Sequence, residues 1–311
     1  MPHRWRGLAA ATALACAALL AAGCSSSLAL DTPSANGKII AIGAENEYAD
    51  VIQQVGGKYV QASAIMSNPN TDPHTFEASA STGRLVNAAR LVVQNGLGYD
   101  TFMDTLEKAV PDSGRHVIVV QKLLGLPDST PNPHLWYDPG TMPKLASAIA
   151  TELAALQPGH AAYFKANATT FTTSLKAWTS AIATFKQQHP GIAVATTEPV
   201  ADYLLQALGA DNKTPWAFQA DVMNGTDPSA QDVAIERSLF TQRKVQAFLY
   251  NQQVTDSLTE SFISLARANH IPVVGVYETM PEPGYNYQSW MQAEVRALDK
   301  AVTSGVSSEH L

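Results

Sequence analysis

Four side chains in this sequence stand where a divalent metal ion can be bound. His74 lies in the stretch NPNTDPHTFEAS and His134 in NPHLWYDPG, and each histidine directly follows a proline. Glu198 ends the strand-like segment GIAVATTE, and Glu278 ends IPVVGVYE. In parallel α/β sheets, ligands bind beyond the carboxyl ends of the strands. Since two imidazoles and two carboxylates suit a divalent transition metal, we predict a metal site made of these four residues.

Each of these residues also has an ordinary structural interpretation. A single histidine in a loop is most often a surface or hydrogen-bonding residue. An acidic side chain is favourable at a helix N-terminus, so Glu198 and Glu278 can also be interpreted as helix N-caps. Glu282 is close enough in sequence to be a second candidate for the role of Glu278.

Strand-like and helix-like segments alternate in two stretches of the chain, residues 38–121 and residues 191–302. Alternation at this spacing predicts βα units and parallel sheets. Between the two stretches, residues 158–188 contain no turn signal until the pair His189-Pro190. Their large apolar residues recur with the period of one helical face. The expected fold class is therefore α/β, with two parallel-sheet lobes joined by one long rigid helix.

The N-terminus has the pattern of a secretory signal. Arg4 and Arg6 precede an apolar run from Leu8 to Leu20, and small residues lead to Cys24. This run of about 13 residues is shorter than the roughly 20 that a membrane-spanning helix needs. The stretch LAAGC is similar to a bacterial lipobox, so we expect lipidation at Cys24, with plain secretion as the alternative. Cys16 lies inside the signal, which leaves no pair of cysteines for a disulfide.

The charge balance and the motifs exclude several classes of function. The formal net charge is −7, and an acidic chain is a poor ligand for nucleic acid. The nucleotide-binding loops GxGxxG and Walker A, the hydrolase elbow GxSxG, the zinc motif HExxH and the CxxC pair do not occur. An enzyme would therefore need a catalytic constellation other than these motifs. Because four protein ligands would fill the coordination shell of a metal ion, we expect metal capture without turnover rather than an enzyme.

The quoted motifs resemble those of the metal-specific solute-binding lipoproteins of bacterial ABC importers, the zinc/manganese-uptake family. NPNTDPHTFEAS is similar to the first ligand loop of that family and NPHLWYDP to the second. TTEPVADYLLQALG resembles its third ligand loop, and PGHAAYFKANATTFTTSLKAW its rigid backbone helix. The resemblance implies metal ligands at His74, His134 and Glu198. The fourth ligand of the family is usually aspartate, and here Glu278 occupies the matching place.

The resemblance also implies how the chain is divided. Residues 1–23 are expected to be a signal peptide, 24–37 a lipid-anchored tether, and 38–157 an N-terminal lobe. Residues 158–188 are expected to form the backbone helix, and 189–311 a C-terminal lobe. The resemblance implies that these parts form a C-shaped clamp, and we expect it to be attached to the outer face of the cell membrane through Cys24.

The function implied is capture of zinc or manganese, with iron as a further possibility, and delivery to an ABC permease and its ATPase. Oxygen ligands favour manganese or ferrous iron, whereas the general order of affinity favours zinc, so both metals stay open. The alternatives are a secreted metal-dependent hydrolase and a surface adhesin of the same family. We expect a monomer.

Overall fold

The computed structural model describes residues 37–68, 76–77, 79–112, 114–281 and 283–311. The chain divides into two units after Thr32, and the first of them lies outside the described residues. The predicted lipidation site Cys24, the predicted ligand His74 and the alternative ligand Glu282 also lie outside them. The fold described below is that of the second unit.

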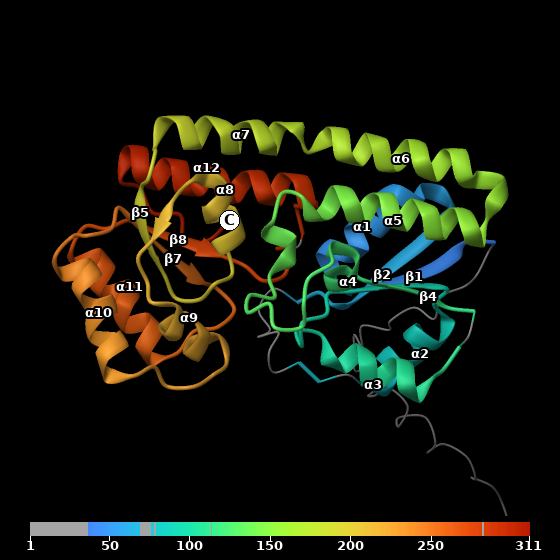
Figure 1. Ribbon diagram of the computed structural model, residues 1–311, viewed down its shortest axis with the longest axis horizontal. Helices are drawn as coiled ribbons and strands as arrows, with labels where there is room; N and C mark the ends of the chain where they lie inside the picture. The colour runs from blue at the N-terminus through green and yellow to red at the C-terminus, as the bar shows by residue number, and fades with distance from the viewer. Residues whose placement is uncertain (1–36, 69–75, 78, 113, 282) are drawn as a thin grey trace, which may run out of the picture. The chain divides into compact units, whose positions relative to one another are not determined.

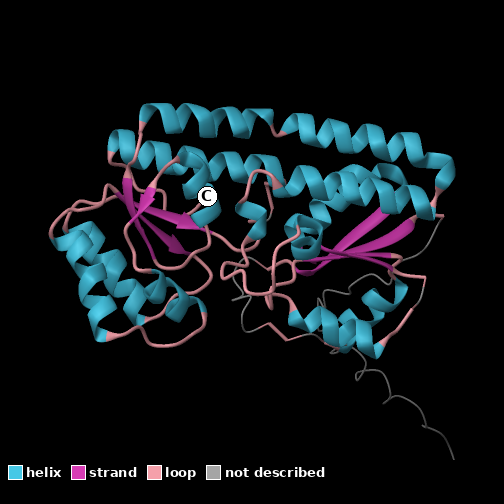
Figure 2. Cartoon of the chain, in the orientation of Figure 1, coloured by secondary structure: helices cyan, strands magenta, loops and turns pink. Residues whose placement is uncertain are grey.

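The first half of this unit is built on a four-stranded parallel sheet with strand order β2-β1-β3-β4. Its strands are β1 (Ile39–Glu45), β2 (Val60–Met66), β3 (Leu91–Gln94) and β4 (His116–Val119). Its helices are α1 (Asn46–Gly56), α2 (Ala80–Ala88), α3 (Thr101–Ala109), α4 (Val120–Leu124) and α5 (Thr141–Leu156). Figures 1 and 2 show helices on both faces of this sheet.

The second half repeats the design with strand order β6-β5-β7-β8, again parallel. Its strands are β5 (Ala193–Thr196), β6 (Asp211–Asn212), β7 (Ala247–Asn251) and β8 (Val273–Val276). Its helices are α8 (Asp202–Leu208), α9 (Trp216–Met223), α10 (Ala230–Thr241), α11 (Ser257–Ala268) and α12 (Tyr287–Ser304). The predicted pair of parallel-sheet α/β lobes is confirmed.

The helical run between the lobes consists of two helices, α6 (Ala161–Ser174) and α7 (Lys176–Gln188), which meet at Leu175. Leu175 keeps right-handed helical φ and ψ angles, so the two helices continue one another (Figure 1). The apolar face predicted from the sequence is buried, including Phe164, Phe171 and Trp178. Helix α5 packs along α6, and α12 packs along α7.

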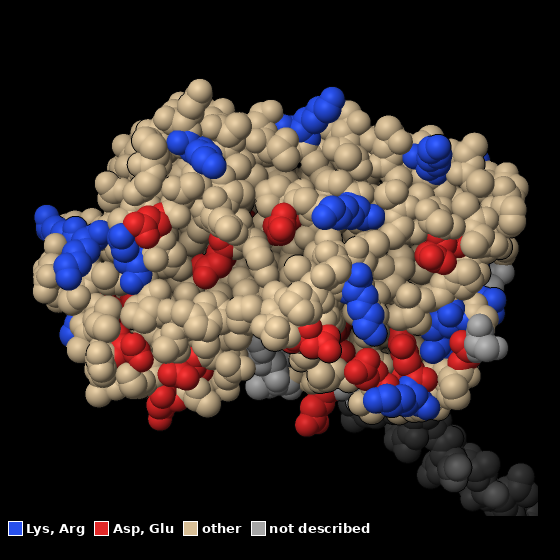
Figure 3. Space-filling model, in the orientation of Figure 1, with Lys and Arg blue, Asp and Glu red and all other residues tan. Residues whose placement is uncertain are grey.

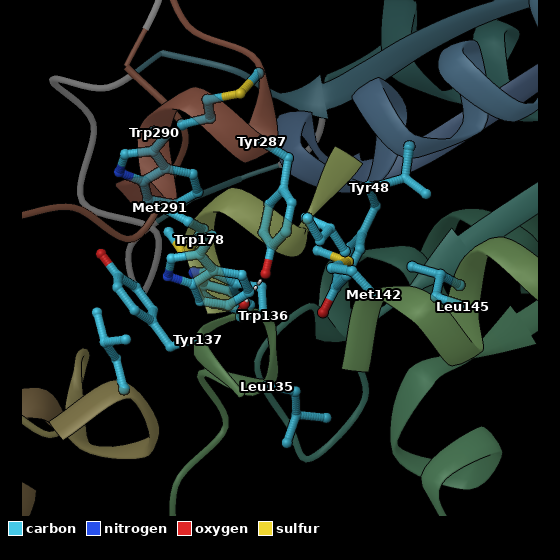
Figure 4. Packing of buried hydrophobic residues seen from close by; sticks show 14 of the residues in the cluster. Tyr48, Leu135, Trp136, Tyr137, Met142, Leu145, Trp178, Tyr287, Trp290 and Met291 are labelled. Atoms are coloured by element: carbon cyan, nitrogen blue, oxygen red, sulfur yellow. Dashed lines mark hydrogen bonds between the residues drawn. The ribbon is translucent and has the colours of Figure 1, made fainter. Parts of the chain in front are cut away.

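One hydrophobic cluster extends through both lobes. Trp136 and Tyr137 belong to the first lobe, while Tyr287 and Trp290 begin α12, and all four are fully buried in the same cluster (Figure 4). Trp178 of α7 meets Tyr287 edge to face, with ring centroids 5.8 Å apart. Replacing one such buried aromatic side chain by alanine typically costs about 3–5 kcal/mol of stability. The lobes are therefore held by a shared core as well as by the connecting helices.

Two general features of the described residues are the distribution of charge on the surface and the apolar character of the helices. On the face drawn in Figure 3, basic and acidic side chains of the described residues are interspersed rather than gathered into one basic area. Within the described part of the chain, no helix combines the length and the apolar character that crossing a membrane requires.

Candidate metal site

The candidate ligands lie near the carboxyl ends of strands in the second sheet and in one loop of the first lobe. Glu198 follows β5 by two residues, and Glu278 follows β8 by two residues. His134 directly precedes the short 3-10 helix η3 (Leu135–Tyr137). All three side chains are buried, and His134 and Glu278 are completely inaccessible to solvent. The strand-end argument from the sequence therefore identified residues that the fold buries between the lobes.

His134 and Glu278 form the centre of this arrangement. His134 Nε2 lies 3.3 Å from Glu278 Oε2. On the other side of the ring, His134 Nδ1 lies 2.7 Å from Asn132 Oδ1, which also accepts a hydrogen bond from the His134 backbone N–H. Asn132 Nδ2 donates to Pro199 O, which fixes the orientation of the amide. His134 therefore carries a hydrogen on Nδ1 and directs Nε2 toward the carboxylate.

This geometry calls for a cation between the two groups. In a neutral imidazole protonated on Nδ1, Nε2 is a lone-pair acceptor, and it faces a carboxylate that is an acceptor too. Either a proton or a metal ion resolves that conflict. Bonds of about 2.0–2.1 Å to a tetrahedral zinc ion place two ligand atoms about 3.3 Å apart. The separation between His134 Nε2 and Glu278 Oε2 has this value.

Glu198 joins this pair through Asn251, the last residue of β7. Asn251 Nδ2 donates to Glu198 Oε1 at 3.2 Å and to Glu278 Oε1 at 2.6 Å. Among the described residues, no three His, Cys, Asp or Glu side chains are grouped closely enough to hold a metal ion by themselves. The described part of the candidate site is therefore the pair His134–Glu278, with Glu198 linked to it by one amide. His74 lies outside that part.

Two further residues hold Glu278 in place. Gln253 Oε1 accepts hydrogen bonds from the backbone N–H groups of Glu278 and Thr279, at 2.6 and 2.9 Å. The Tyr99 hydroxyl donates to Glu278 Oε2 at 2.9 Å. Burial, together with the neighbouring carboxyl groups, raises the pKa of Tyr99 well above its ordinary value. The hydroxyl therefore stays protonated and remains a donor to the carboxylate.

Hydrogen bonds across the lobes connect the ligand-bearing loops. The Tyr137 hydroxyl, three residues after His134, donates to Tyr277 O at 2.8 Å. The side-chain amide of Asn46, at the start of α1, donates to Met280 O and accepts from Met280 N, at 2.8 and 2.9 Å. Tyr277 and Met280, which receive these hydrogen bonds from the first lobe, stand on either side of Glu278 in the sequence. The position of Glu278 therefore depends on the first lobe as well as on its own strand.

A group of buried acids lies beside the site. Burial is the largest cause that raises the pKa of Glu45 and of Glu47 well above the ordinary value, and nearby Asp100 adds to the shift. Burial also raises the pKa of Asp100 to about 6, although it accepts hydrogen bonds from the backbone of Asn95 and Gly96. Glu278 contributes to the raised pKa of Glu47. These raised pKa values favour the protonated, neutral form of Glu45 and Glu47, so a cation bound beside them would favour release of their protons.

The alternative interpretation of the two glutamates as helix caps is wrong. Ala201 is the N-cap residue of α8, and Asn286 caps α12 through its side chain. Glu198 and Glu278 occupy neither position. Sequence reasoning also missed Asn251 and Glu45, although both end a strand and the same strand-end argument applies to them.

Comparison with known proteins identifies one family model and several relatives that match most of the chain. The family model described as "Zinc-uptake complex component A periplasmic" matches residues 44–301. The manganese-binding lipoprotein MntA of Bacillus subtilis is 22% identical over 313 residues, covering 96% of this chain and 99% of MntA. The zinc-binding protein TroA of Treponema pallidum is 23% identical over 250 residues, covering 78% of this chain and 80% of TroA.

Solved structures share the fold at low sequence identity. The periplasmic zinc-binding protein TroA of Treponema pallidum superposes with a TM-score of 0.72 and 20% identity, covering 87% of this chain and all of TroA. The manganese-bound periplasmic metal-binding protein of Candidatus Liberibacter asiaticus superposes with a TM-score of 0.70 and 16% identity, covering 85% of this chain and all of that protein.

Proposed function

Because the chain belongs to the family of periplasmic zinc-uptake complex component A proteins, we propose that it captures one divalent transition metal ion outside the cytoplasm and delivers it to an ABC importer. The observation that carries this proposal is the pair His134 Nε2 and Glu278 Oε2, buried and 3.3 Å apart, with the other ring nitrogen fixed by Asn132. A buried imidazole whose acceptor nitrogen faces a carboxylate is the arrangement that a metal ion completes.

The proposed ligands are His74, His134, Glu198 and Glu278. Asn251 supports the assignment of the two glutamates, because it donates to both carboxylates. Four protein ligands fill the coordination shell of zinc, whereas a catalytic zinc keeps one position for water. The family is one of metal-uptake components, so the hydrolase and adhesin alternatives have no support from it.

Zinc and manganese are both candidate cargoes, with iron as a third. The relatives compared above include a manganese-binding lipoprotein and a zinc-binding protein, each about as similar to this chain as the other. A mixed nitrogen and oxygen ligand set accepts all three metals, and zinc binds most tightly among them to most such sites.

The proposed setting is the outer face of the cell membrane. Residues 1–23 act as the signal peptide, and Cys24 carries the lipid anchor at the start of a tether that ends at residue 37. Release of the ion to the permease, whose transport the ATPase drives, requires either a shift of the lobes 38–157 and 189–311, joined through 158–188, or movement of a ligand loop. The protein acts as a monomer. Release of the Cys24→Ser protein from the membrane fraction supports the anchor, and unchanged membrane association contradicts it.

Metal titration of the purified, chelator-treated protein tests the ligand assignment. We expect one ion per chain, and we expect Glu278→Gln to weaken binding by more than the roughly 10–100-fold typical of outer-sphere changes. The matched control is Glu282→Gln, which removes a carboxylate four residues away and is expected to leave the affinity unchanged. The opposite result assigns the fourth ligand to Glu282. Absence of binding by the unaltered protein contradicts the proposed function.

A further inference from the structure

Asn251 occupies the middle of the candidate site without being one of its ligands. It ends β7, which lies between β5 and β8 in the second sheet. These two neighbours are the strands that precede Glu198 and Glu278. The Asn251 side chain is 1% exposed, and its amide nitrogen reaches one oxygen of each carboxylate, at 3.2 and 2.6 Å.

The orientation of this amide is fixed by its other contacts. Asn251 Oδ1 accepts a hydrogen bond from the backbone N–H of Gln253 at 3.0 Å. The Asn251 backbone N–H donates to Thr197 Oγ1 at 3.0 Å. A flipped amide would set its oxygen against the two carboxylates and its NH2 group against a backbone N–H. Asn251 therefore presents both amide hydrogens to the two carboxylates.

The hydrogen bonds from Asn251 also influence which oxygen of each carboxylate faces the candidate metal position. An oxygen that accepts from Asn251 is directed toward that amide. In Glu278 the oxygen bonded to Asn251 is Oε1, while Oε2 faces His134 Nε2 and accepts from the Tyr99 hydroxyl. Oε2 is therefore the Glu278 oxygen that faces the proposed ligand His134, whereas Oε1 is the oxygen held by Asn251. Glu198 is held toward Asn251 in the same way, through its Oε1.

We infer that Asn251 is a positioning residue that restricts Glu198 and Glu278 to one metal-binding oxygen each and so favours zinc over manganese. This inference rests on the function proposed above. With the histidines of the proposed ligand set, two single oxygens make four donors, the number that zinc prefers. Manganese prefers six oxygen-rich donors in octahedral geometry. Carboxylates released from Asn251 can bind through both oxygens and thereby approach the arrangement that suits manganese.

The test compares zinc and manganese affinities in variants that remove the amide. Asn251→Leu removes both donors while keeping most of the volume, and Asn251→Ala removes them without adding bulk. Zinc affinity is expected to fall roughly 10–100-fold, as for other outer-sphere substitutions, and manganese affinity by less than about 10-fold. Competition titrations with a chelator measure both values, and X-ray absorption of the manganese-loaded variants is expected to show a higher coordination number than in the unaltered protein.

The matched control is Asn212→Ala. Asn212 lies on β6 of the same sheet, and its amide donates to Thr196 Oγ1 and Asp202 Oδ1 rather than to the candidate ligands. It is expected to leave the ratio of zinc to manganese affinity unchanged. Equal weakening of both metals in the Asn251 variants, or an unchanged ratio, overturns this inference and leaves the proposed function standing. Failure of the unaltered protein to bind either metal overturns the proposed function instead.

Discussion

Replacing Glu294 by glutamine is predicted to change how folding stability depends on pH. Glu294 lies on α12 and is 3% exposed. Its Oε1 accepts a hydrogen bond from Trp290 Nε1 at 2.9 Å and lies 3.2 Å from the oxygen of the Tyr137 hydroxyl, which donates to the backbone carbonyl of Tyr277, the residue before Glu278. Burial raises the pKa of Glu294 from its ordinary value of 4.5 to about 8.

The sign of the effect follows from proton linkage. Between pH 4.5 and about 8 the folded protein keeps a proton on Glu294 that the unfolded chain has released. Stability due to this group is therefore highest below the unfolded pKa, falls as pH rises through the window, and levels off above the folded pKa. One pKa unit corresponds to about 1.4 kcal/mol, so the loss between about pH 5 and about pH 9 is on the order of 4 kcal/mol.

Glu294→Gln removes this loss, because the amide carries no titrating proton. Urea unfolding of metal-free protein at several pH values is expected to show the variant gaining about 4 kcal/mol relative to the unaltered protein from about pH 5 to about pH 9. Glu260→Gln, an exposed position on α11, is the matched control and is expected to show no such gain. Parallel pH profiles for Glu294→Gln and the unaltered protein refute the reasoning.

Three further predictions concern the site. Asn46→Ala removes both hydrogen bonds to Met280 and is expected to cost about 1–3 kcal/mol in denaturant unfolding, together with weaker metal binding; unchanged metal affinity speaks against coupling between the lobes. Tyr99→Phe removes the donor to Glu278 and is expected to lower metal affinity roughly 10–100-fold by calorimetry, whereas no change makes the contact incidental. Metal affinity is expected to fall between about pH 7.5 and about pH 5.5, because ligand imidazoles must be unprotonated, and a flat profile argues against histidine ligands.

The two sheets were predictable because each strand carries its own local signal. β-branched apolar segments followed by amphipathic helices predict βα units wherever they occur. Helix α9 was not predicted, since its apolar residues do not separate onto one face, and β6 has only two residues. The interruption at Leu175 was also missed, because neither glycine nor proline stands there.

The candidate ligands were predictable to the extent that strand ends mark them. That argument selected Glu198 and Glu278 because carboxylates are common metal ligands, and it passed over Asn251 because an amide is not. The contacts that position the loops join residues far apart in the chain, such as Tyr137 with Tyr277 and Asn46 with Met280. Such pairs leave no periodic pattern in one sequence, so only the folded chain reveals them.

A crystal structure of the zinc-loaded protein with anomalous diffraction at the zinc edge tests the central claim most directly. The account predicts one strong anomalous peak per chain, bonded to His134 Nε2 and Glu278 Oε2 at about 2.0–2.2 Å. The same map identifies the other ligands, for which His74 and Glu198 are predicted. A peak elsewhere on the protein, with His134 still facing Glu278 and no metal between them, contradicts the account.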